Sequence, residues 1–595
     1  MKLSFAAVSL CMLAVACAAR GEDAALGRRI EQFLLIDAHG KTHTQAEFAD
    51  RKALVLVTLA TECPLARAYA PRLAELATEF APQGVAIIGI APGAPETPTR
   101  LSRFSENYKL TYPLLKDQGG ALADKLGATR TPEAFVLDRD RVVRYHGRVD
   151  DQFAVGVQRG TVASRDLADA INDVLAGREV ALPSSAFGGC LIARAEKVEP
   201  KGQLTYAKHV AAIFNRRCVE CHREGELAPF ALTSYQQAAD WAENIHEVVR
   251  ENRMPPWLAD PRYGNFSNDC SMKPEEKQTV LSWIDDGCPQ GNPADLPTPP
   301  TFVTGWRMGK PDITYTMNES YSVPAEGTVD YKYFVVEPAV KEDLWIAGAE
   351  ARPGNVAVVH HVVLFAVPPE VKIDPNNLEQ VQAGGKMIAI YAPGMNPWTY
   401  PEGTAVKVEK GSAFVIQLHY TPNGTAQQDR SFAGIRLADP AKVKRRANYG
   451  MAVNPNILIP PGAADVEIKS AARFARDTLL LNLFPHMHFR GKAFRFEVEL
   501  PDGQREVLLD VPRYDFNWQL RYDLAEPKFL PKGTRLLCTA HYDNSAANPW
   551  NPDPSATVRF GLQTWEEMMV GYYTTMPAEE RVAQRQAADS IAKDE

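Results

Sequence analysis

The proline-rich stretch NPADLPTPPT, residues 292–301, divides this chain of 595 residues into two halves with different hydrophobic patterns. Before this stretch, apolar runs alternate with amphipathic helical patterns. After it, short alternating runs are separated by Gly, Pro and Asn, which is typical of antiparallel sandwiches. Domains usually hold about 100–200 residues, so one compact core cannot contain the whole chain. The sequence therefore predicts a multidomain protein.

The half before the proline-rich stretch changes pattern once more. Residues 25–195 alternate strand-like runs such as ALVLVTLA and VAIIGIAP with helical stretches, which is an α/β pattern. Residues 203–292 carry helical periods such as YAKHVAAIFNRRC, so we expect a small all-α domain there. The β half divides near VNPNILIPPG. We expect two all-β sandwiches over 302–452 and 453–577, followed by a polar tail over 578–595.

The first residues have the pattern of a secretory signal. Lys2 precedes the apolar run LSFAAVSLCMLAVACAA, which ends in small residues. We therefore expect residues 1–19 to be a signal peptide and the mature protein to be periplasmic or otherwise exported. Cleavage before Cys17 would add a lipid anchor, although Ala14 disfavours that course, and we expect membrane contact only in that case. No later stretch reaches the roughly 18 apolar residues that cross a bilayer.

Charge and cysteine content narrow the functions further. The formal net charge of -8 is spread along the chain and lacks the basic footprint that nucleic acid requires, so no nucleic-acid partner is expected. Two of the nine cysteines lie in the signal, and an exported protein can form disulfides with the others. Cys270 and Cys288 flank a helical pattern, and we expect a structural disulfide between them.

The motif CVECH is typical of covalent attachment of a c-type haem. Cys218 and Cys221 would bond the porphyrin edge, and His222 would bind the iron. A redox disulfide or a chance CxxC is the alternative. Met254 in RMPPW is the best candidate for the sixth iron ligand, with Met272 as the alternative, and His/Met ligation raises the potential of an electron carrier. With its closing helix VLSWIDDG, the segment resembles class I cytochromes c, which implies one covalently bound haem c.

Histidines gather in the β half. In FPHMHFRGKAF, His486 and His488 share one face of a strand, with Cα atoms roughly 6.5–7 Å apart, so both imidazoles can converge on one metal ion. Such a pair alone is a weak signal, because His-x-His occurs in ordinary sheets. Further donors make two clusters, which predict two metals, one of them biased towards Cu(I) by a thioether. These donors are His360, His361, His419, Met568 and Met569.

The order His-His, Gln-x-His-Tyr, His-x-His and Glu-Met resembles the type II copper, ascorbate-dependent monooxygenases, the group of peptidylglycine α-hydroxylating and dopamine β-monooxygenases. The resemblance implies two jelly-roll-like sandwich domains, two copper ions, and O2 with a small organic substrate. Ascorbate or an electron-transfer protein would be the reductant. It also implies that His360, His361 and His419 hold the electron-supplying copper, that His486, His488 and Met568 hold the oxygen-activating copper, and that Gln417 and Tyr572 belong to the site.

The chain departs from that family at several positions. Phe484 stands where peptide-amidating members carry an arginine that grips the substrate carboxylate, so peptide amidation is not expected. Met569 could replace Met568 as the copper ligand, although the Glu-Met alignment favours Met568. We expect Cys538 to be a buried thiol and His541 to be a hydrogen-bonded structural histidine.

The first domain resembles thioredoxin-like redoxins of the alkyl hydroperoxide reductase and thiol-specific antioxidant kind. The resemblance rests on ATECPLARAYAP after a central strand and on TRTPEAFVLD, where Thr131-Pro132 matches the cis-proline turn of that fold. Cys63 lies where a helix begins, and the helix dipole lowers the pKa of a thiol there, so Cys63 is the candidate nucleophile. The second cysteine of a CxxC motif is absent. Cys190 either resolves Cys63 in a redox cycle or forms a permanent disulfide with it.

Together these observations predict an exported redox enzyme of three modules, in which copper oxygenates an organic substrate and the haem passes electrons to the first copper. Two alternatives stay open. The chain could be a periplasmic copper-binding and electron-transfer protein without turnover. It could also be a thiol-based peroxide or disulfide reductase driven by its first domain. Activity that depends on Cys63 rather than on His486 would favour the thiol-based alternative.

Overall fold

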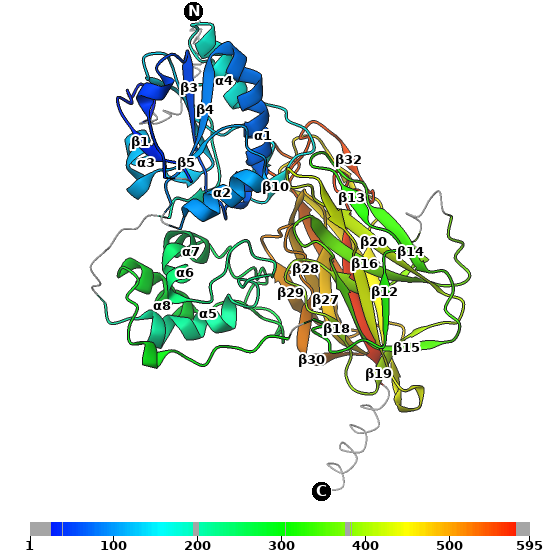
Figure 1. Ribbon diagram of the computed structural model, residues 1–595. Helices are drawn as coiled ribbons and strands as arrows, with labels where there is room; N and C mark the ends of the chain where they lie inside the picture. Colours follow the sequence, from blue (N-terminus) through cyan, green and yellow to red (C-terminus); the bar gives the residue numbers. More distant parts are fainter. Residues whose placement is uncertain are drawn as a thin grey trace, which may run out of the picture.

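The computed structural model describes residues 25–578 apart from 39, 94, 194–201, 304, 375–380 and 382–383. The expected signal peptide, Cys17 and the polar tail after residue 578 lie outside the described residues. Figure 1 shows a first domain in blue (25–193), a helical segment in green (202–303) and a large β half (305–578) beside both. Within the described parts of the chain, no helix is both long and apolar enough to cross a membrane.

A mixed sheet forms the centre of the first domain. Its strands are β1 (Leu34–Ile36), β2 (Thr42–Thr44), β3 (Ala53–Thr58), β4 (Val85–Ala91), β5 (Leu114–Lys116), β7 (Glu133–Leu137) and β8 (Val143–Gly147). They lie in the order β2-β1-β5-β4-β3-β7-β8, with β3, β4 and β5 parallel to one another and β7 antiparallel to β3. Short strands pair outside this sheet: β6 (Arg130–Thr131) with β11 (Cys190–Leu191), and β9 (Phe153–Ala154) with β10 (Val157–Gln158).

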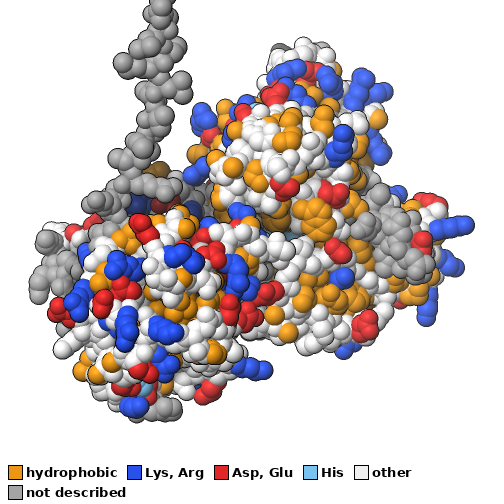
Figure 2. All heavy atoms as spheres, turned by 90° about the horizontal axis from the view of Figure 1, so that it is seen from above, with side chains coloured by type: hydrophobic (Ala, Val, Ile, Leu, Met, Phe, Trp, Pro, Cys, Tyr) orange, Lys and Arg blue, Asp and Glu red, His pale blue; other side chains and the backbone are white. Residues whose placement is uncertain are grey.

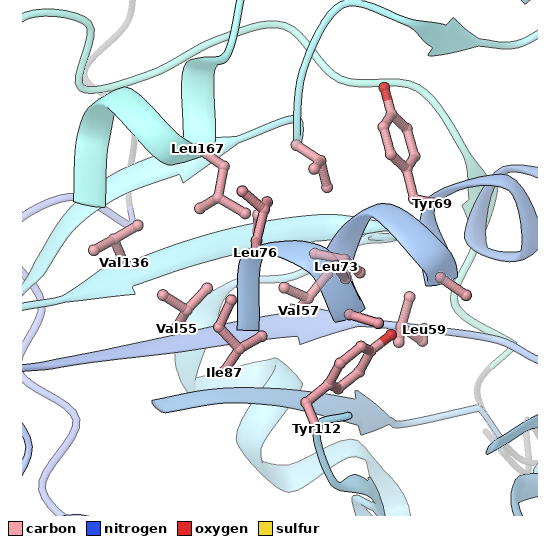
Figure 3. Close-up of a cluster of buried hydrophobic side chains, with 14 of the residues drawn as sticks. Val55, Val57, Leu59, Tyr69, Leu73, Leu76, Ile87, Tyr112, Val136 and Leu167 are labelled. Atoms are coloured by element: carbon pink, nitrogen blue, oxygen red, sulfur yellow. The ribbon is translucent and has the colours of Figure 1, made fainter. Parts of the chain in front are cut away.

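Helices cover both faces of this sheet. They are α1 (Pro64–Phe80), α2 (Pro98–Asn107), α3 (Ala121–Leu126) and α4 (Asp166–Leu175). Val55 and Val57 of β3 pack with Leu73 of α1 and Leu167 of α4 in one core (Figure 3). Leu54 packs with α3 in the core on the opposite face. Because both faces are buried, β3 reads as a continuous apolar run rather than an alternating one.

The helical segment follows the first domain. It contains α5 (Ala211–Arg217), α6 (Tyr235–Asp240), α7 (Ala242–Arg250) and α8 (Pro274–Asp285), with a π-type turn over Tyr206–Val210. Its core joins Phe214, Trp241 and Trp283. Pro274 begins α8, where its missing N–H costs no helical hydrogen bond. The small all-α arrangement expected for this part of the chain is therefore present.

The expected disulfide between Cys270 and Cys288 is wrong. Both are free thiols, as are the other cysteines among the described residues. Helix α8 lies between the two, and its 12 residues, at about 1.5 Å per residue, span roughly 18 Å. A disulfide needs Cα atoms about 5.5–6 Å apart. The helix therefore holds the two thiols near its opposite ends.

The first sandwich of the β half carries two main sheets and a separate two-stranded sheet. The main sheets lie in the orders β12-β22-β15-β19-β23 and β14-β20-β16-β17, and almost all of their pairs are antiparallel. The strands are β12 (Ile313–Thr316), β13 (Tyr321–Val323), β14 (Lys332–Glu337), β15 (Leu344–Arg352), β16 (Val359–Val367), β17 (Lys386–Tyr391), β18 (Trp398–Thr399), β19 (Thr404–Val408), β20 (Ala413–Tyr420), β21 (Gln427–Asp429), β22 (Phe432–Leu437) and β23 (Arg445–Arg446).

The second sandwich has sheets in the orders β24-β33-β27-β30 and β26-β31-β28-β29. Its strands are β24 (Asn448–Val453), β25 (Leu458–Ile459), β26 (Val466–Arg473), β27 (Thr478–His486), β28 (Gly491–Glu499), β29 (Arg505–Val511), β30 (Tyr522–Leu530), β31 (Arg535–Tyr542), β32 (Val558–Arg559) and β33 (Val570–Pro577). The expected division at 452/453 falls inside β24. Because β24 pairs with β33 along its whole length, the second sandwich begins at Asn448.

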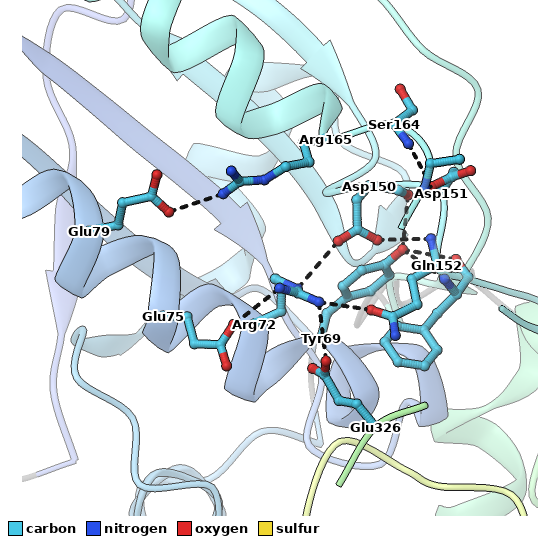
Figure 4. Close-up of polar contacts among 12 residues, drawn as sticks. Tyr69, Arg72, Glu75, Glu79, Asp150, Asp151, Gln152, Ser164, Arg165 and Glu326 are labelled. Atoms are coloured by element: carbon cyan, nitrogen blue, oxygen red, sulfur yellow. Dashed lines mark hydrogen bonds and ion pairs between the residues drawn. The ribbon is translucent and has the colours of Figure 1, made fainter. Parts of the chain in front are cut away.

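Polar contacts join the three parts. Arg72 of α1 reaches Glu326 of the β half at 3.4 Å, within the network drawn in Figure 4. The backbone N–H of Asp260 in the helical segment donates to the carbonyl of Asp510 in the second sandwich at 2.8 Å. On the face seen in Figure 2, basic and acidic side chains are interspersed, in keeping with the spread charge of the sequence.

Candidate thiol and metal sites

Cys63 lies at the N-terminus of α1, shortly after the central strand β3. Pro64 begins the helix, because its missing N–H and fixed φ suit the first helical position. Cys63 is 0% exposed, and its thiol donates a hydrogen bond to the carbonyl of Thr131 at 3.1 Å. The expected cis bond between Thr131 and Pro132 is present. The thiol therefore lies beside the cis-proline turn.

Cys190, from a distant part of the chain, lies beside Cys63 and the cis-proline turn. Strand β11 pairs with β6, which places Cys190 opposite Thr131, and the Cys190 thiol donates a hydrogen bond to the sulfur of Cys63. Burial raises the pKa of Cys63, but this bond and backbone N–H groups, including that of Ala66, outweigh burial and lower the pKa to about 6. The bond to Cys63, together with burial, raises the pKa of Cys190. When Cys63 ionises, it gives up the proton that it donates to the Thr131 carbonyl and keeps the hydrogen bonds that it accepts, so the pair holds one thiolate.

The rate at which iodoacetamide alkylates Cys63 is expected to rise through about pH 6 and to level off above about pH 7. The thiolate is the nucleophile, and a pKa of about 6 makes Cys63 mostly thiolate at neutral pH. In the Cys190→Ala variant the donated hydrogen bond is lost, so the midpoint is expected to shift upward. Mass spectrometry of the peptide that contains Cys63 measures both midpoints. An unshifted midpoint would contradict the contact between the two sulfurs.

A buried carboxylate supports this site, and sequence reasoning missed it. Glu133 is 1% exposed and accepts the backbone N–H groups of Thr129 and Arg130 at 2.8 and 2.9 Å. Its other oxygen lies 2.7 Å from Nε2 of His146. These bonds hold the loop that carries Thr131. The signal in the sequence is a Glu at the head of the apolar strand EAFVLD.

Three histidines of the first sandwich converge on one point. His360 and His361 lie on β16, and His419 lies on the adjacent β20, directly opposite His361. One ring nitrogen from each of the three lies within 4.8 Å of the others. Neighbouring residues of a regular strand point to opposite faces, but the pairing of β16 with β20 shifts register between Val359 and His361. This irregularity lets the two adjacent histidines share a site.

Hydrogen bonds decide which nitrogens of this cluster are available. His361 Nε2 donates to Gln417 Oε1 at 3.3 Å, and Gln417 donates to the Tyr333 hydroxyl at 2.9 Å. Among the described residues, no partner satisfies either ring nitrogen of His360 or the buried Nδ1 of His419. Burial lowers the pKa of His360 to about 4, and those of His361 and His419 well below the usual value. Neutral imidazoles with unsatisfied lone pairs fit a bound metal ion.

The second histidine pair lies at and just after the end of β27. The ring centroids of His486 and His488 are 5.2 Å apart. His486 Nδ1 donates to Gln519 Oε1 at 2.6 Å. His488 Nδ1 donates to the carbonyl of Glu566 at 3.2 Å, and its Nε2 is buried with no partner in the described part of the chain. Burial lowers the pKa of both rings, that of His486 to about 4, so Nε2 of each is available for a ligand.

Strand alternation separates the two candidate methionines. Phe484 of β27 lies opposite Tyr572 of β33, and both rings lie near that of His486. Met568 packs in the same apolar cluster as Phe484 and Tyr572, whereas Met569 packs in the interior of the second sandwich. Met568 and Met569 directly precede β33, and their side chains point to opposite sides, as neighbouring residues of an extended chain do. The geometry therefore favours Met568 over Met569 as the thioether donor.

Phe516 links the two clusters. Its ring stacks on that of His360, with centroids 4.9 Å apart and 9° between the planes. The ring of His488 meets the same phenylalanine edge-on at 6.2 Å. The two candidate metal sites are therefore neighbours. In the sequence, Phe516 and Gln519 belong to the aromatic-rich run RYDFNWQLRYD, which indicates core packing or a pocket lining but does not mark either residue as part of a metal site.

Glu567 ties together the segments that carry the second pair. Its carboxylate accepts the backbone N–H groups of His488 at 2.9 Å, Arg490 at 2.7 Å and Met568 at 3.3 Å. Burial raises the pKa of Glu567 to about 8. The side chain thus fixes His488 and Met568 relative to each other.

The CVECH motif follows α5 in the helical segment. His222 Nδ1 donates to the carbonyl of Phe230 at 3.1 Å, which leaves Nε2 available for a ligand. Cys218 and Cys221 are free thiols, and burial raises the pKa of both. Two free thiols and an imidazole held through its other nitrogen fit covalent attachment of a haem.

The two candidate sixth ligands of the haem are placed differently. Met272 packs against the core that also includes Cys218. Met254 follows α7, and Trp257 in the same RMPPW turn packs on Tyr522 of the second sandwich, with ring centroids 4.9 Å apart. That contact directs the turn towards the β half. Of the two methionines, Met272 is the one that packs against the core of the motif.

The structure also shows the positions of Cys538 and His541, the two residues expected to be structural. Cys538 is 1% exposed, as expected for a buried thiol. His541 on β31 forms a hydrogen bond with Asp465 at 3.0 Å.

Comparison with known proteins bears on the first domain. The AhpC/TSA family matches residues 26–146. The first domain is a thioredoxin-like redoxin. We refer to it below as the redoxin domain, and the chain joins it to a large all-β C-terminal region.

Several known proteins resemble the redoxin domain. Thiol-disulfide oxidoreductase ResA of Bacillus thuringiensis subsp. konkukian (strain 97-27) is 28% identical over 119 residues, 20% of this chain and 67% of that protein. Thiol:disulfide interchange protein DsbE of Yersinia pestis is 32% identical over 128 residues, 21% of this chain and 64% of that protein. The chain thus spans about two thirds of each relative. The solved structure of a hypothetical protein from Sinorhizobium meliloti 1021 is 35% identical, with 28% of this chain and 93% of that chain covered at a TM-score of 0.26.

Proposed function

We propose that the redoxin domain exchanges thiols and disulfides through Cys63 and Cys190. The main observation in favour is that Cys63 and Cys190 lie together beside Thr131, with Cys63 at a helix N-terminus. The similarity to ResA and DsbE, whose names describe thiol-disulfide chemistry, supports it. A helix N-terminus and a neighbouring donor stabilise a thiolate, which is the attacking species in such exchange.

The reaction follows from the two positions. The Cys63 thiolate attacks a substrate disulfide, which forms a mixed disulfide and releases one substrate thiol. The Cys190 thiol then gives up its proton and attacks the sulfur of Cys63, so the mixed disulfide breaks and a Cys63–Cys190 disulfide forms. Overall, two cysteine thiols are oxidised, and the substrate disulfide gains two electrons and two protons to become two thiols.

Redox equilibration tests whether the pair cycles or forms a permanent disulfide. The purified chain is equilibrated with dithiothreitol at graded potentials, and the peptide linked through Cys63 and Cys190 is quantified by mass spectrometry. Cycling predicts a midpoint above about −300 mV, because structural disulfides of exported proteins lie below that value. A lower midpoint, or no linked peptide at any potential, would refute the proposal.

We further propose that the β half binds two copper ions and uses O2 to oxygenate a small organic substrate. The observation in favour of this second function is the first cluster, with three imidazole nitrogens within 4.8 Å of one another. Copper would supply one-electron redox chemistry and O2 binding. Burial of the donors keeps bulk water from the centre, and Gln417, Gln519 and Glu567 orient them. The donors would be His360, His361 and His419 for one ion, and His486, His488 and Met568 for the other.

A haem c on the CVECH motif is the electron source that we propose for the copper sites, with ascorbate or an electron-transfer protein as the alternative. Glu220 of the motif pairs with Arg307 at 3.0 Å, and Arg307 donates to Asn396 Oδ1 of the first sandwich at 3.0 Å. These contacts hold the motif against the β half and support electron transfer from the helical segment to the first cluster. We also propose that the protein is exported, on the strength of its signal-like first residues.

Metal analysis with oxygen uptake tests the copper proposal. The purified chain is expected to bind about two copper ions and one covalent haem, and to consume O2 in proportion to product when a reductant is supplied. A copper carrier would bind the metal without consuming oxygen. A chain that binds no copper would exclude both functions.

A further inference from the structure

Residues 188–191 are held between the redoxin domain and the helical segment. On one side, β11 pairs with β6, with Cys190 opposite Thr131. On the other side, the Asn244 carboxamide of α7 accepts the Leu191 N–H at 2.9 Å and donates to the Leu191 carbonyl at 3.1 Å. One side chain from the helical segment thus satisfies both backbone groups of the residue that follows Cys190.

An ion pair closes the same junction. Arg130 of β6 donates to Glu247 of α7 at 2.5 Å and to the carbonyl of Gly189 at 2.8 Å. The two charged side chains are 28% and 17% exposed, so solvent screens them less than a pair in open water. Cys190 packs against the core of the redoxin domain and also against the core of the helical segment. The resolving cysteine is therefore part of a domain junction.

This junction closes the surface above the nucleophile. Cys63 is 0% exposed. Gly189 approaches Thr131 so closely that an added Cβ would lie 2.1 Å from its carbonyl oxygen. Thiol-disulfide exchange requires access to the attacking sulfur. A substrate therefore cannot reach Cys63 while residues 188–191 occupy the edge of β6.

We propose that α7 is a cover that holds Cys190 on Cys63 and keeps external disulfides from the pair. The inference rests on the proposed thiol exchange and adds its regulation. For reaction, α7 must release residues 188–191, which breaks the contacts of Asn244 and Glu247. Residues 188–191 can then leave the edge of β6 and expose Cys63. The free energy of this local opening then sets how often the thiol can react.

The Glu247→Arg variant tests the cover in the full chain. Like charges then face each other at Arg130, so the rate at which N-ethylmaleimide modifies Cys63 is expected to rise at least about tenfold. Mass spectrometry of the Cys63 peptide measures the rate. Arg250→Glu is the matched control, because Arg250 lies on the exposed face of α7, and it is expected to leave the rate unchanged. No rise in Glu247→Arg, or an equal rise in the control, would overturn the proposal.

Two more variants keep the test decisive if Glu247→Arg impairs folding. Asn244→Leu removes only the two hydrogen bonds to Leu191, and the same direction of change is expected. In the double variant Arg130→Glu/Glu247→Arg, opposite charges face each other again, but the bond to the Gly189 carbonyl is lost and Arg253 no longer has a carboxylate partner at position 247, so protection of Cys63 is expected to return only in part. Faster modification of Cys63 in Glu247→Arg or Asn244→Leu supports the cover. If the chain also reduces no disulfide substrate, the proposed thiol-disulfide exchange fails but the cover stands.

Discussion

The Cys63→Ser variant is expected to lose disulfide reductase activity by about a thousandfold or more. A serine hydroxyl is not ionised near neutral pH, whereas Cys63, with a pKa of about 6, is mostly thiolate. Only the sulfur can also form the mixed disulfide with the substrate. The rate at which the purified chain, supplied with dithiothreitol, reduces insulin disulfides measures the effect.

Cys190→Ser separates attack from resolution. Cys63 can still attack, but no second thiol displaces the substrate, so a mixed disulfide is expected to accumulate as a species with the added substrate mass. Cys538→Ala is the matched control, because Cys538 lies in the core of the second sandwich, and it is expected to keep full activity. Reductase activity that survives in Cys63→Ser would contradict the proposed exchange.

The His419→Ala variant is expected to lower copper content from about two ions per chain to about one, and to reduce oxygen consumption at least about a hundredfold. The first cluster would keep only the two donors of β16, while the second cluster keeps its own. Loss of an outer-shell partner alone typically costs about 10–100-fold in affinity or activity, and loss of a ligand costs more. Metal analysis and an oxygen electrode measure the two effects.

His541→Ala is the control for this experiment. His541 is partly exposed and bonds to Asp465, outside both clusters. It is expected to leave copper content and oxygen consumption unchanged. Equal copper content in His419→Ala and His541→Ala would refute the assignment of His419 as a ligand.

Local pattern predicted much of the redoxin domain. The run ALVLVTLA indicates a strand, and β3 covers its first six residues. Cys63 followed by Pro64 indicates a helix start, and α1 begins there. Such features depend on neighbours along the chain, through apolar periodicity and the preference of proline for the first helical turn.

Other features could not be predicted from local pattern. The disulfide expected between Cys270 and Cys288 is absent because the two backbones are held by different partners: Tyr235 donates to the Cys288 carbonyl, whereas Arg217 donates to the carbonyl of Asp269, the neighbour of Cys270. The register shift beside His360 depends on how β16 pairs with β20. Gln519 orients His486 only because a loop of the second sandwich folds over the end of β27.

By itself, the sequence determined the kinds of local element and the set of available donors, including the thiol at a helix start and the imidazoles on strands. Only the tertiary structure decided which of them meet: Cys190 interacts with Cys63, Met568 rather than Met569 packs with Phe484 and Tyr572, and Asn244 of α7 bonds to the residue after Cys190. The physical reason is the sequence separation over which each kind of interaction acts. Capping and periodicity act over a few residues, whereas these meetings depend on strand register and packing between segments far apart in the chain.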